Sequence, residues 1–416
     1  MLRLGSPLYL ARLLWRGRAE PLYRTHLGER FGFGPPVPAG ALWVHAVSLG
    51  ETRAAAALID ALRERQPALR LILTHPSATG RDAGAALLRE GDVQRWLPFD
   101  TPGAVRRFLR GTRPAAGVLM ETEIWPNLQR AALDAGVPMV LANARLSARS
   151  LRRGERFKAI LAPAARTLRL ALAQTEADAD RLRQAGVPDV RVCGNLKFDL
   201  QPDDALLARG RQWRAAMVRP VVMLAVSREG EEAAAVRAWA SMIRERVAAG
   251  APLLLIVPRH PQRFDEIAAL IQASGLSLAR RSQFASGEPD EASATADVWL
   301  GDSMREMALY YGLSDVALLG GSFEPLGGQN LIEAAACGVP LLMGPHTFNF
   351  AEAAALSLEA GASRRVDDLP QALTLALTLL GDPTRREAMV AAATTFAAAH
   401  RGAAARMAEP ILGLMR

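Results

Sequence analysis

The stretch DVALLGGSFEPLGGQNLIEAAACGVPLLMGPHTFNF (Asp315–Phe350) carries the clearest fold signal in the chain. Its apolar run Val316–Leu319 stops at a glycine pair, as a buried parallel strand does. A second glycine pair precedes Asn330, and Asn330 with Glu333 has the spacing of an N-cap and its reciprocal acid, which predicts a helix start. The run Val339–Met343 predicts another strand. This order is typical of a nucleotide-binding unit whose backbone N–H groups meet an anion, although an ordinary βαβ crossover with glycine turns is the alternative.

The same alternation of apolar runs and Ala/Leu/Arg-rich segments extends over most of the chain. We expect strands at residues 42–47, 69–74, 117–120, 138–142, 168–173, 190–193, 221–226, 253–257, 298–300, 316–319 and 339–343. The polar stretch 201–214 interrupts the pattern and is interpreted as a linker. Two such blocks in 416 residues predict an α/β protein of two doubly wound domains, with ligands at the carboxyl ends of the strands in a cleft that the domains face.

Composition limits the possible partners. Hydrophobic residues make up 50% of the chain, as in a globular protein. A formal charge of +8 suits an anionic partner such as phosphate, nucleotide or an acidic lipid surface. The basic residues do not interleave with aromatic ones, which argues against nucleic acid. Only two cysteines occur, Cys193 and Cys337, which favours a reducing, cytoplasmic compartment.

No metal or cofactor is predicted. The six histidines lack ligand spacing, and the chain has no P-loop and no GxSxG. Asp178-Ala179-Asp180 matches a DxD pattern but lies at a charged helix start, so we interpret it as a solvated face.

The N-terminal segment has two interpretations. Its apolar part, residues 2–15, is interrupted by Arg3, Pro7 and Arg12 and is too short to span a bilayer. Its leucines and flanking arginines fit either an interfacial segment whose arginines reach lipid phosphates or a helix packed on its own domain. We expect a peripheral membrane contact at most.

Four charged residues in the first half follow predicted strands. Glu51, in HAVSLGE, lies near a helix start, where it can accept a proton from a hydroxyl or merely complement the helix dipole. Glu121 and Glu123, in METEIWPN, can orient a base or pair with a cation, or they are solvated turn residues. Lys197, in GNLKFD, is one of two lysines in an arginine-rich chain, which suggests a need for a compact point charge; a surface residue is the alternative.

The second half shows a local repeat of the first. The stretch from His45 to Ala57, with Gly50-Glu51, is echoed between Ala225 and Ala235, with Gly230-Glu231, which supports a duplication. Three arginines after predicted strands can clamp a phosphate in forked geometry or form a solvated cluster. They are Arg228, Arg259 and Arg263.

Eight motifs in order resemble the 3-deoxy-D-manno-octulosonic acid (Kdo) transferases of lipopolysaccharide assembly. They are HAVSLGE, METEIWPN, NARLS, GNLKFD, VSREGEE, PRHPQRF, GDSMRE and GGSFEPLGGQN through GPHTFNF. The resemblance implies a GT-B fold, in which two Rossmann-like domains face a cleft and a C-terminal helix crosses back. It also implies inverting, metal-independent transfer from CMP-Kdo to a lipid A precursor of the lipid IVA type, at the cytoplasmic face of the inner membrane.

The resemblance also assigns roles by position. Glu51 matches the general base, and Glu121 and Lys197 match residues that stabilise the transition state. The CMP-contacting stretches match Pro258-Arg259, Met304-Arg305-Glu306 and Asn330-Leu331-Ile332-Glu333, and Arg228 joins them from its strand-end position. Arg305 stands where the family typically carries glycine.

These inferences predict four parts of the chain. Residues 1–30 form a membrane-proximal segment, 31–205 an acceptor-binding domain, 206–395 a nucleotide-sugar-binding domain, and 396–416 a helix that packs back on the N-terminal domain. Two other functions stay open: a GT-B enzyme or epimerase that uses a UDP-sugar, and a non-catalytic basic module that binds membrane or nucleic acid.

Overall fold

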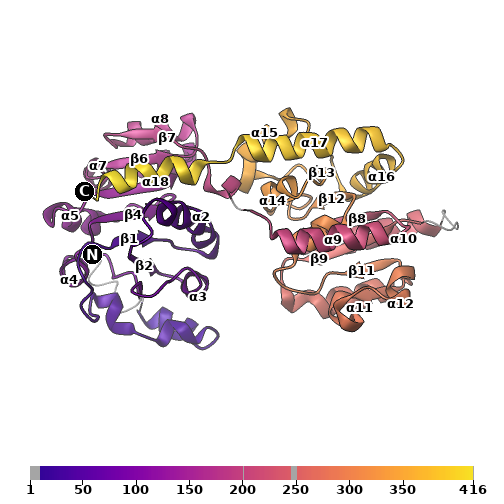
Figure 1. The fold of residues 1–416 in the computed structure, drawn as a ribbon, viewed down its shortest axis with the longest axis horizontal. Helices are drawn as coiled ribbons and strands as arrows, with labels where there is room; N and C mark the ends of the chain where they lie inside the picture. The colour runs from indigo at the N-terminus through magenta and orange to yellow at the C-terminus, as the bar shows by residue number, and fades with distance from the viewer. Residues whose placement is uncertain (1–9, 200, 245–250, 416) are drawn as a thin grey trace. The chain divides into compact units, whose positions relative to one another are not determined.

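The computed structural model describes residues 10–199, 201–244 and 251–415, which form two compact units (Figure 1). Unit 1 comprises Met1–Leu200 and His400–Arg416, and unit 2 comprises Gln201–Ala399.

Unit 1 is built on a seven-stranded parallel sheet with the order β3-β2-β1-β4-β5-β6-β7. Its strands are β1 (Leu42–His45), β2 (Leu71–His75), β3 (Val93–Trp96), β4 (Ala116–Met120), β5 (Met139–Ala144), β6 (Leu170–Ala173) and β7 (Val190–Val192). Its helices are α2 (Leu49–Arg65), α3 (Ala78–Ala85), α4 (Pro102–Thr112), α5 (Pro126–Asp134), α6 (Ala148–Glu155), α7 (Lys158–Arg166), α8 (Glu176–Ala185) and α18 (Ala403–Gly413). Along β1, Leu42 and Val44 join one hydrophobic core and Trp43 another, so the sheet is buried on both faces.

The C-terminal helix α18 belongs to unit 1. Figure 1 shows it in yellow among the indigo and magenta elements that begin the chain. Its side chains Met407 and Ile411 are fully buried in the same core as Leu58 of α2. At the start of α18, the carboxylate of Asp199 accepts hydrogen bonds from the backbone N–H groups of Gly402 and Ala404 at 2.5 Å each.

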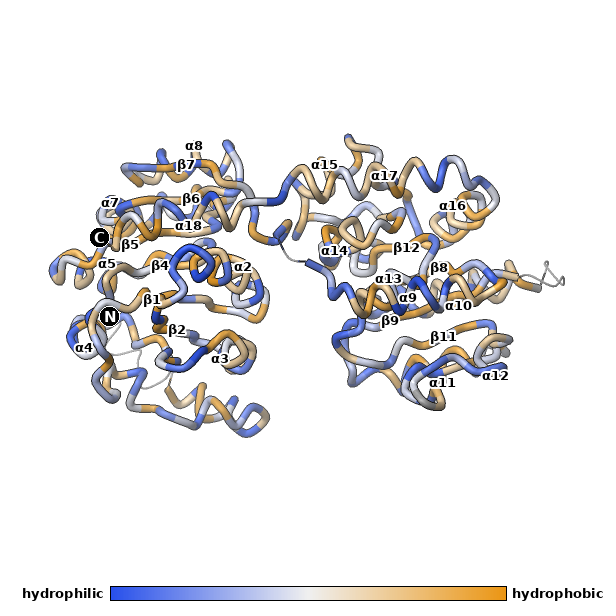
Figure 2. The backbone as a smooth tube through the Cα atoms, viewed as in Figure 1, coloured by the Kyte–Doolittle hydropathy of each residue, from blue (hydrophilic) through white to orange (hydrophobic). Residues whose placement is uncertain are grey.

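Unit 2 contains a second seven-stranded parallel sheet, with the order β10-β11-β9-β8-β12-β13-β14. Its strands are β8 (Val221–Ser227), β9 (Leu253–Pro258), β10 (Leu278–Arg280), β11 (Val298–Leu300), β12 (Val316–Leu319), β13 (Leu341–Met343) and β14 (Ser363–Arg365). Its helices are α9 (Asp204–Ala216), α10 (Glu231–Arg244), α11 (Phe264–Ala273), α12 (Glu291–Thr295), α13 (Met307–Leu313), α14 (Leu331–Ala336), α15 (Ala351–Glu359), α16 (Leu369–Leu380) and α17 (Pro383–Ala399). Figure 2 shows hydrophobic colour along the central strands and alternating colours along the surrounding helices. The α/β class with two parallel sheets is confirmed.

The strands that contain continuous apolar runs are the ones that the sequence predicts. All eleven expected strands form, with ends shifted by about two residues at most. The helix start at Asn330 is also confirmed, because the Asn330 side chain accepts a hydrogen bond from the Ile332 N–H at 3.2 Å. The three strands that the sequence missed are β3, β10 and β14, with the sequences VQRW, LAR and SRR. Each lies at a sheet edge, where one side of the strand is unpaired and an apolar run is not required.

The predicted linker at residues 201–214 is wrong, because most of this stretch forms helix α9. Leu207, Gly210 and Trp213 are its buried positions, a three-residue spacing that places them on one face. A Cβ atom at Gly210 would lie 2.1 Å from a backbone carbonyl oxygen of α13. Helices α9 and α13 therefore approach at a glycine, and the polar composition of α9 describes only its outer face.

Candidate functional site

Glu51 is held at the carboxyl end of β1 by the start of helix α2. The Ser48 side chain is the N-cap of α2 and accepts a hydrogen bond from the Glu51 N–H at 3.2 Å. The Glu51 carboxylate turns back toward the strand, where its Oε2 accepts the Val47 N–H at 2.7 Å and its Oε1 accepts the Ser48 hydroxyl at 3.3 Å. This reciprocal capping fixes the carboxylate over the strand end while leaving it partly exposed.

The surroundings of Glu51 favour a carboxyl group that exchanges a proton near neutral pH. Burial raises the pKa of Glu51 to about 7, and the negative charges of Glu121 and Glu123 push the pKa in the same direction. The hydrogen bonds from Val47 and Ser48 oppose this rise only in part. A pKa near the working pH is the property that a general base needs.

Glu121 lies on the neighbouring strand end. It follows β4, which pairs with β1, so both acids lie at the same edge of the sheet. Its backbone has a φ of 59°, a left-handed conformation that is uncommon for a residue other than glycine. The Glu121 N–H donates to the Ala142 carbonyl at 2.9 Å, and the Glu121 carbonyl accepts from the Arg145 N–H at 3.2 Å. The unusual backbone is therefore held by β5 and the turn that follows it.

Lys197 reaches Glu121 although β7, the strand before it, lies at the far edge of the sheet. The Asn195 side chain donates to the Gln174 side chain, which follows β6, at 3.0 Å. The Leu196 N–H donates to the side chain of Asn143, near the end of β5, at 3.0 Å. These two hydrogen bonds hold residues 195–197 across the ends of β6 and β5. The Lys197 Nζ then lies 3.8 Å from the Glu121 Oε1, with the two side chains 22% and 21% exposed.

The structure thus brings Glu51, Glu121 and Lys197 together in unit 1. Two carboxylates and one ammonium lie at one edge of a parallel sheet, where ligands bind in open α/β folds. Lys197 is the counter-ion of Glu121. The Glu51 carboxylate instead accepts a backbone N–H and a serine hydroxyl, and no cation among the described residues pairs with it. This arrangement suits proton transfer by Glu51 and charge stabilisation by Lys197.

The residues proposed for nucleotide binding follow four neighbouring strands of the unit 2 sheet, β11, β9, β8 and β12, and so lie at one edge. Arg259, Met304 and Arg305 are exposed there, and Arg228 and Asn330 are partly exposed. The side chains of Leu331 and Ile332 are buried in the core, 0% and 1% exposed, and Pro258 is buried too. Only the main chain of these three can meet a ligand.

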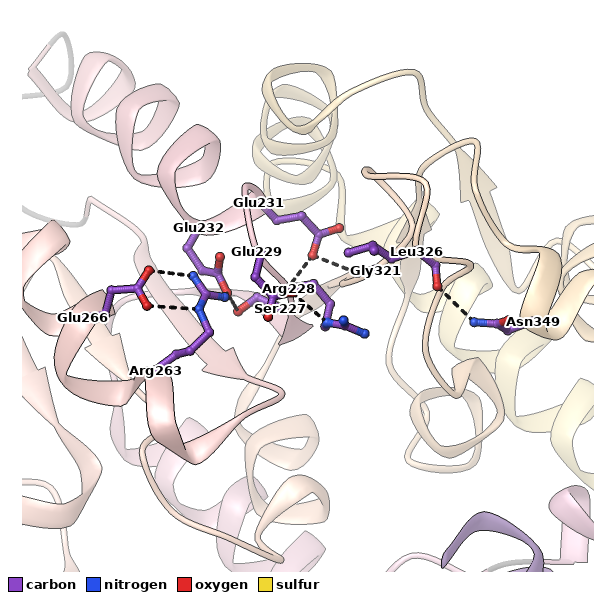
Figure 3. Close-up of polar contacts among 10 residues, drawn as sticks. All are labelled: Ser227, Arg228, Glu229, Glu231, Glu232, Arg263, Glu266, Gly321, Leu326 and Asn349. Atoms are coloured by element: carbon purple, nitrogen blue, oxygen red, sulfur yellow. Dashed lines mark hydrogen bonds and ion pairs between the residues drawn. The ribbon is translucent and has the colours of Figure 1, made fainter. Parts of the chain in front are cut away.

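Arg263 is not available as a phosphate clamp, which corrects the interpretation of three strand-end arginines. Figure 3 shows its guanidinium between Glu232 and Glu266. Its NH1 lies 2.8 Å from the Glu232 Oε1, and its NH2 lies 3.1 Å from the Glu266 Oε1. These two carboxylates raise the pKa of Arg263 further. Arg228, whose one carboxylate partner among the described residues is the exposed Glu229 at 3.1 Å, and Arg259 remain as candidates, and Glu306 is already paired with Arg281 at 2.9 Å.

Sequence reasoning missed the part played by Glu231, the first residue of helix α10. Its carboxylate accepts three backbone N–H groups. Those of Arg228 at 2.9 Å and Gly321 at 2.8 Å are shown in Figure 3, and the third is that of Phe323 at 3.1 Å. It thereby joins the loop after β8 to the loop after β12. The signal in the sequence was the Gly-Glu pair shared by the two halves.

Comparison with known proteins decides the family. The chain is 50% identical over 409 residues to a 3-deoxy-D-manno-octulosonic acid transferase of Bordetella pertussis, which covers 96% of this chain and 94% of that protein. The chain belongs to the Kdo transferase family. The family model described as 3-Deoxy-D-manno-octulosonic-acid transferase (kdotransferase) matches residues 25–200. The transferase of Haemophilus influenzae is 34% identical over 418 residues, covering 98% of this chain and 96% of its own.

The fold of this family member is GT-B, and it is a glycosyltransferase. A solved UDP-GlcNAc 2-epimerase of Neisseria meningitidis, bound to UDP-GlcNAc, has the same fold. That structure matches with a TM-score of 0.59 and 16% identity, over 90% of this chain and 99% of the epimerase. At this identity the likeness concerns the fold alone.

Arg305, for which the family resemblance implies a glycine position, has a φ of 66°. Glycine adopts this left-handed backbone without the steric penalty that arginine carries. We predict that Arg305→Gly raises the free energy of unfolding of unit 2 by about 0.5 to 1 kcal/mol, the relief of strain outweighing the added chain entropy. As a control, Arg237→Gly on an exposed turn of α10 should lower it by about 1 kcal/mol. Urea unfolding checks both, and a loss of stability in Arg305→Gly would contradict the account.

The aspartates of the DxD pattern do not both lie on a solvated face, so that interpretation is wrong for Asp178. Asp178 is 5% exposed, accepts the Leu146 N–H at 2.9 Å and pairs with Arg181 at 2.9 Å. Asp180 is exposed and pairs with Arg183. The first aspartate ties the turn after β5 to helix α8. Within the described ranges, no group of three or more His, Cys, Asp or Glu is placed to hold a metal ion.

Proposed function

We propose that this protein transfers Kdo from CMP-Kdo to a lipid A precursor of the lipid IVA type, with inversion and without a metal. The observation that supports this proposal most strongly is the pKa of Glu51, which is raised to about 7 beside the Glu121–Lys197 pair. The relatives from B. pertussis and H. influenzae, both named as Kdo transferases, support the sugar. We further propose that the reaction takes place at the cytoplasmic face of the inner membrane. No helix of the described residues is long and apolar enough to cross a bilayer.

Each unit would have its own role in the reaction. Unit 2 holds the donor, with Arg228 and Arg259 near the CMP phosphate and the capped start of α14 beside them. Unit 1 binds the acceptor and supplies Glu51. In the reaction, the Glu51 carboxylate takes the proton of an acceptor hydroxyl, whose oxygen attacks the anomeric carbon of Kdo. The bond from that carbon to the phosphate oxygen breaks, and CMP leaves with the electron pair. Cationic side chains stabilise the charge that develops on the phosphate.

The pKa of Glu51 predicts the pH dependence of transfer. A general base acts in its deprotonated form, and Glu51 loses its proton at a pH of about 7. We therefore expect kcat/KM to rise about tenfold per pH unit from pH 5 to 6 and to level off above about pH 7. Initial rates at fixed ionic strength between pH 5 and 8.5 measure this. A flat profile over that range would show that no such base limits the reaction.

The donor nucleotide distinguishes the proposal from a UDP-sugar enzyme of the same fold. Titration calorimetry with CMP and with UDP, each added to the intact protein, compares the two. We expect CMP to bind and UDP to bind at least tenfold more weakly. Tighter binding of UDP would favour the alternative function.

A further inference from the structure

Helices α6 and α7 expose two large apolar side chains at the surface of unit 1. Helix α6 buries none of its residues, and α7 buries only Ala164 and Ala165. Phe157, between the helices, is 61% exposed, and Ile160, three residues later, is 57% exposed. At this spacing the two side chains lie on one side of the α7 turn. An aromatic and a branched aliphatic residue presented together to water indicate a contact that is completed by something else.

The same surface is strongly basic. Its five basic residues are exposed and have no hydrogen bond or ion pair through their side chains with any described residue. They are Arg149, Arg152, Arg153, Arg156 and Lys158. The only acid between residues 145 and 166 is Glu155. We call this surface, residues 149–160, the basic-apolar surface. Elsewhere in the unit, arginines such as Arg63 and Arg81 are paired with carboxylates.

We propose that the basic-apolar surface docks on a bilayer of anionic phospholipid. Phe157 and Ile160 would enter the headgroup boundary while the cations meet lipid phosphates, the arrangement by which amphipathic segments bind membranes. Isoleucine offers no stacking face for a nucleic-acid base, so the apolar part fits lipid better than RNA or DNA.

The position of the basic-apolar surface explains what the membrane contact would do in the reaction. This step rests on the proposed function. Helix α6 begins three residues after Arg145, whose N–H donates to the Glu121 carbonyl at 3.2 Å. Helix α6, which carries part of the surface, therefore begins close to the strand edge that carries Glu121 and Glu51. A lipid-linked acceptor could remain in the bilayer while its sugar hydroxyl reaches Glu51.

Vesicle sedimentation of the full chain tests the docking. We expect wild-type protein to bind vesicles of phosphatidylethanolamine and phosphatidylglycerol, and to bind phosphatidylcholine vesicles far less. Replacing both apolar residues, F157S/I160S, should weaken binding about tenfold or more through lost apolar burial. Removing two cations, R152S/R153S, should weaken it about tenfold or more and reduce its salt dependence.

The matched control is Leu133→Ser, which removes an apolar side chain of α5 that is 53% exposed. It should leave vesicle binding unchanged. The proposal is overturned if F157S/I160S binds as wild type does, if only Trp15→Ser (68% exposed in wild type) abolishes binding, or if the protein binds duplex DNA but no anionic vesicle. None of these readouts depends on Kdo transfer, so they separate the docking from the reaction.

A second inference comes from the equivalent places of Glu51 and Glu231. Strand β1 lies between β2 and β4, and β8 lies between β9 and β12, so each is followed by a helix at the same place in its sheet. Each helix has its glutamate in the first turn. The Glu51 carboxylate accepts one backbone N–H, whereas the fully buried Glu231 carboxylate accepts three.

We infer that Glu231 is a positioning residue for the donor, given the proposed function. Its hydrogen bond from the Arg228 N–H fixes the backbone of this arginine just after β8. Its hydrogen bonds from the N–H groups of Gly321 and Phe323 hold the loop after β12 in place beside it. This carboxylate is fully buried and already accepts three N–H groups, so a substrate hydroxyl cannot reach it to give up a proton. The same position thus holds the general base in unit 1 and, in unit 2, a residue that holds two loops together.

Glu231→Gln tests this inference, because an amide cannot accept at both ends. We expect the Kd for CMP and the donor KM to rise about tenfold while kcat changes less than threefold. The exposed Glu359→Gln, at the end of α15 in the same unit, is the control and should change neither. A merely structural role would lower the melting temperature and leave the CMP affinity of the folded protein unchanged, which would overturn the inference. Wild-type protein that fails to bind CMP would instead refute the proposed donor.

Discussion

Glu51→Gln should lower kcat of Kdo transfer by about a thousandfold and leave the Kd for CMP unchanged. The amide keeps the shape of the side chain and can still accept the Val47 N–H, but it cannot take a proton. General-base catalysis contributes about 10² to 10⁴ to the rate. The nucleotide affinity should persist because Arg228 and Arg259 belong to the other unit.

The control for Glu51→Gln lies on the same helix. Glu64 is exposed near the end of α2, and Glu64→Gln should transfer Kdo at the wild-type rate. Single-turnover measurements with CMP-Kdo isolate the chemical step from product release. A rate within threefold of wild type in Glu51→Gln would remove this residue as the base. Loss of CMP affinity would mean that the two units do not divide the roles as proposed.

Neutralising the Glu121–Lys197 pair should also cause a large loss, and the losses should not add. We expect Lys197→Met and Glu121→Gln each to lower kcat by about a hundredfold, because each leaves the other charge without its counter-ion. The double variant should be about as active as the worse single variant, since both changes disrupt one arrangement.

A double-mutant cycle on kcat measures this coupling. Arg191→Met, at an exposed position of β7 that pairs with Asp189, is the control for loss of a cation near the same segment and should have little effect. Independent losses that multiply to about ten-thousandfold would contradict a joint role. Lys197→Arg should recover only part of the rate, because a guanidinium is broader than an ammonium and cannot occupy the same position beside Glu121.

The sequence contained most of the fold because apolar runs are sufficient to define buried parallel strands. It missed the edge strands β3, β10 and β14, which are three or four residues long and have no continuous apolar run longer than two residues. It also mistook α9 for a linker, because the buried face of that helix consists of few residues and includes Gly210, which is not an apolar signal.

The candidate site was predictable only in part. Glu121 directly follows an apolar run, and Glu51 comes shortly after one, behind Ser48-Leu49-Gly50, so their place near a strand end could be read from the sequence. The approach of Lys197 to Glu121 could not, because it depends on Asn195 and Leu196 bonding to side chains beyond two other strands. For the same reason Arg263 resembled a free cation, although Glu232 and Glu266 hold it. Long-range hydrogen bonds leave no periodic pattern in a sequence.

The central claim is that one unit holds the cytidine nucleotide and the other activates a lipid-linked hydroxyl. Incubation of the purified protein with CMP-Kdo and a lipid A precursor, followed by mass spectrometry of the lipid, tests it most directly. The account predicts a lipid heavier by one or more Kdo residues, formed in the presence of a metal chelator, together with an equal amount of CMP. An unchanged lipid under these conditions, or a product formed only from a UDP-sugar, would contradict it.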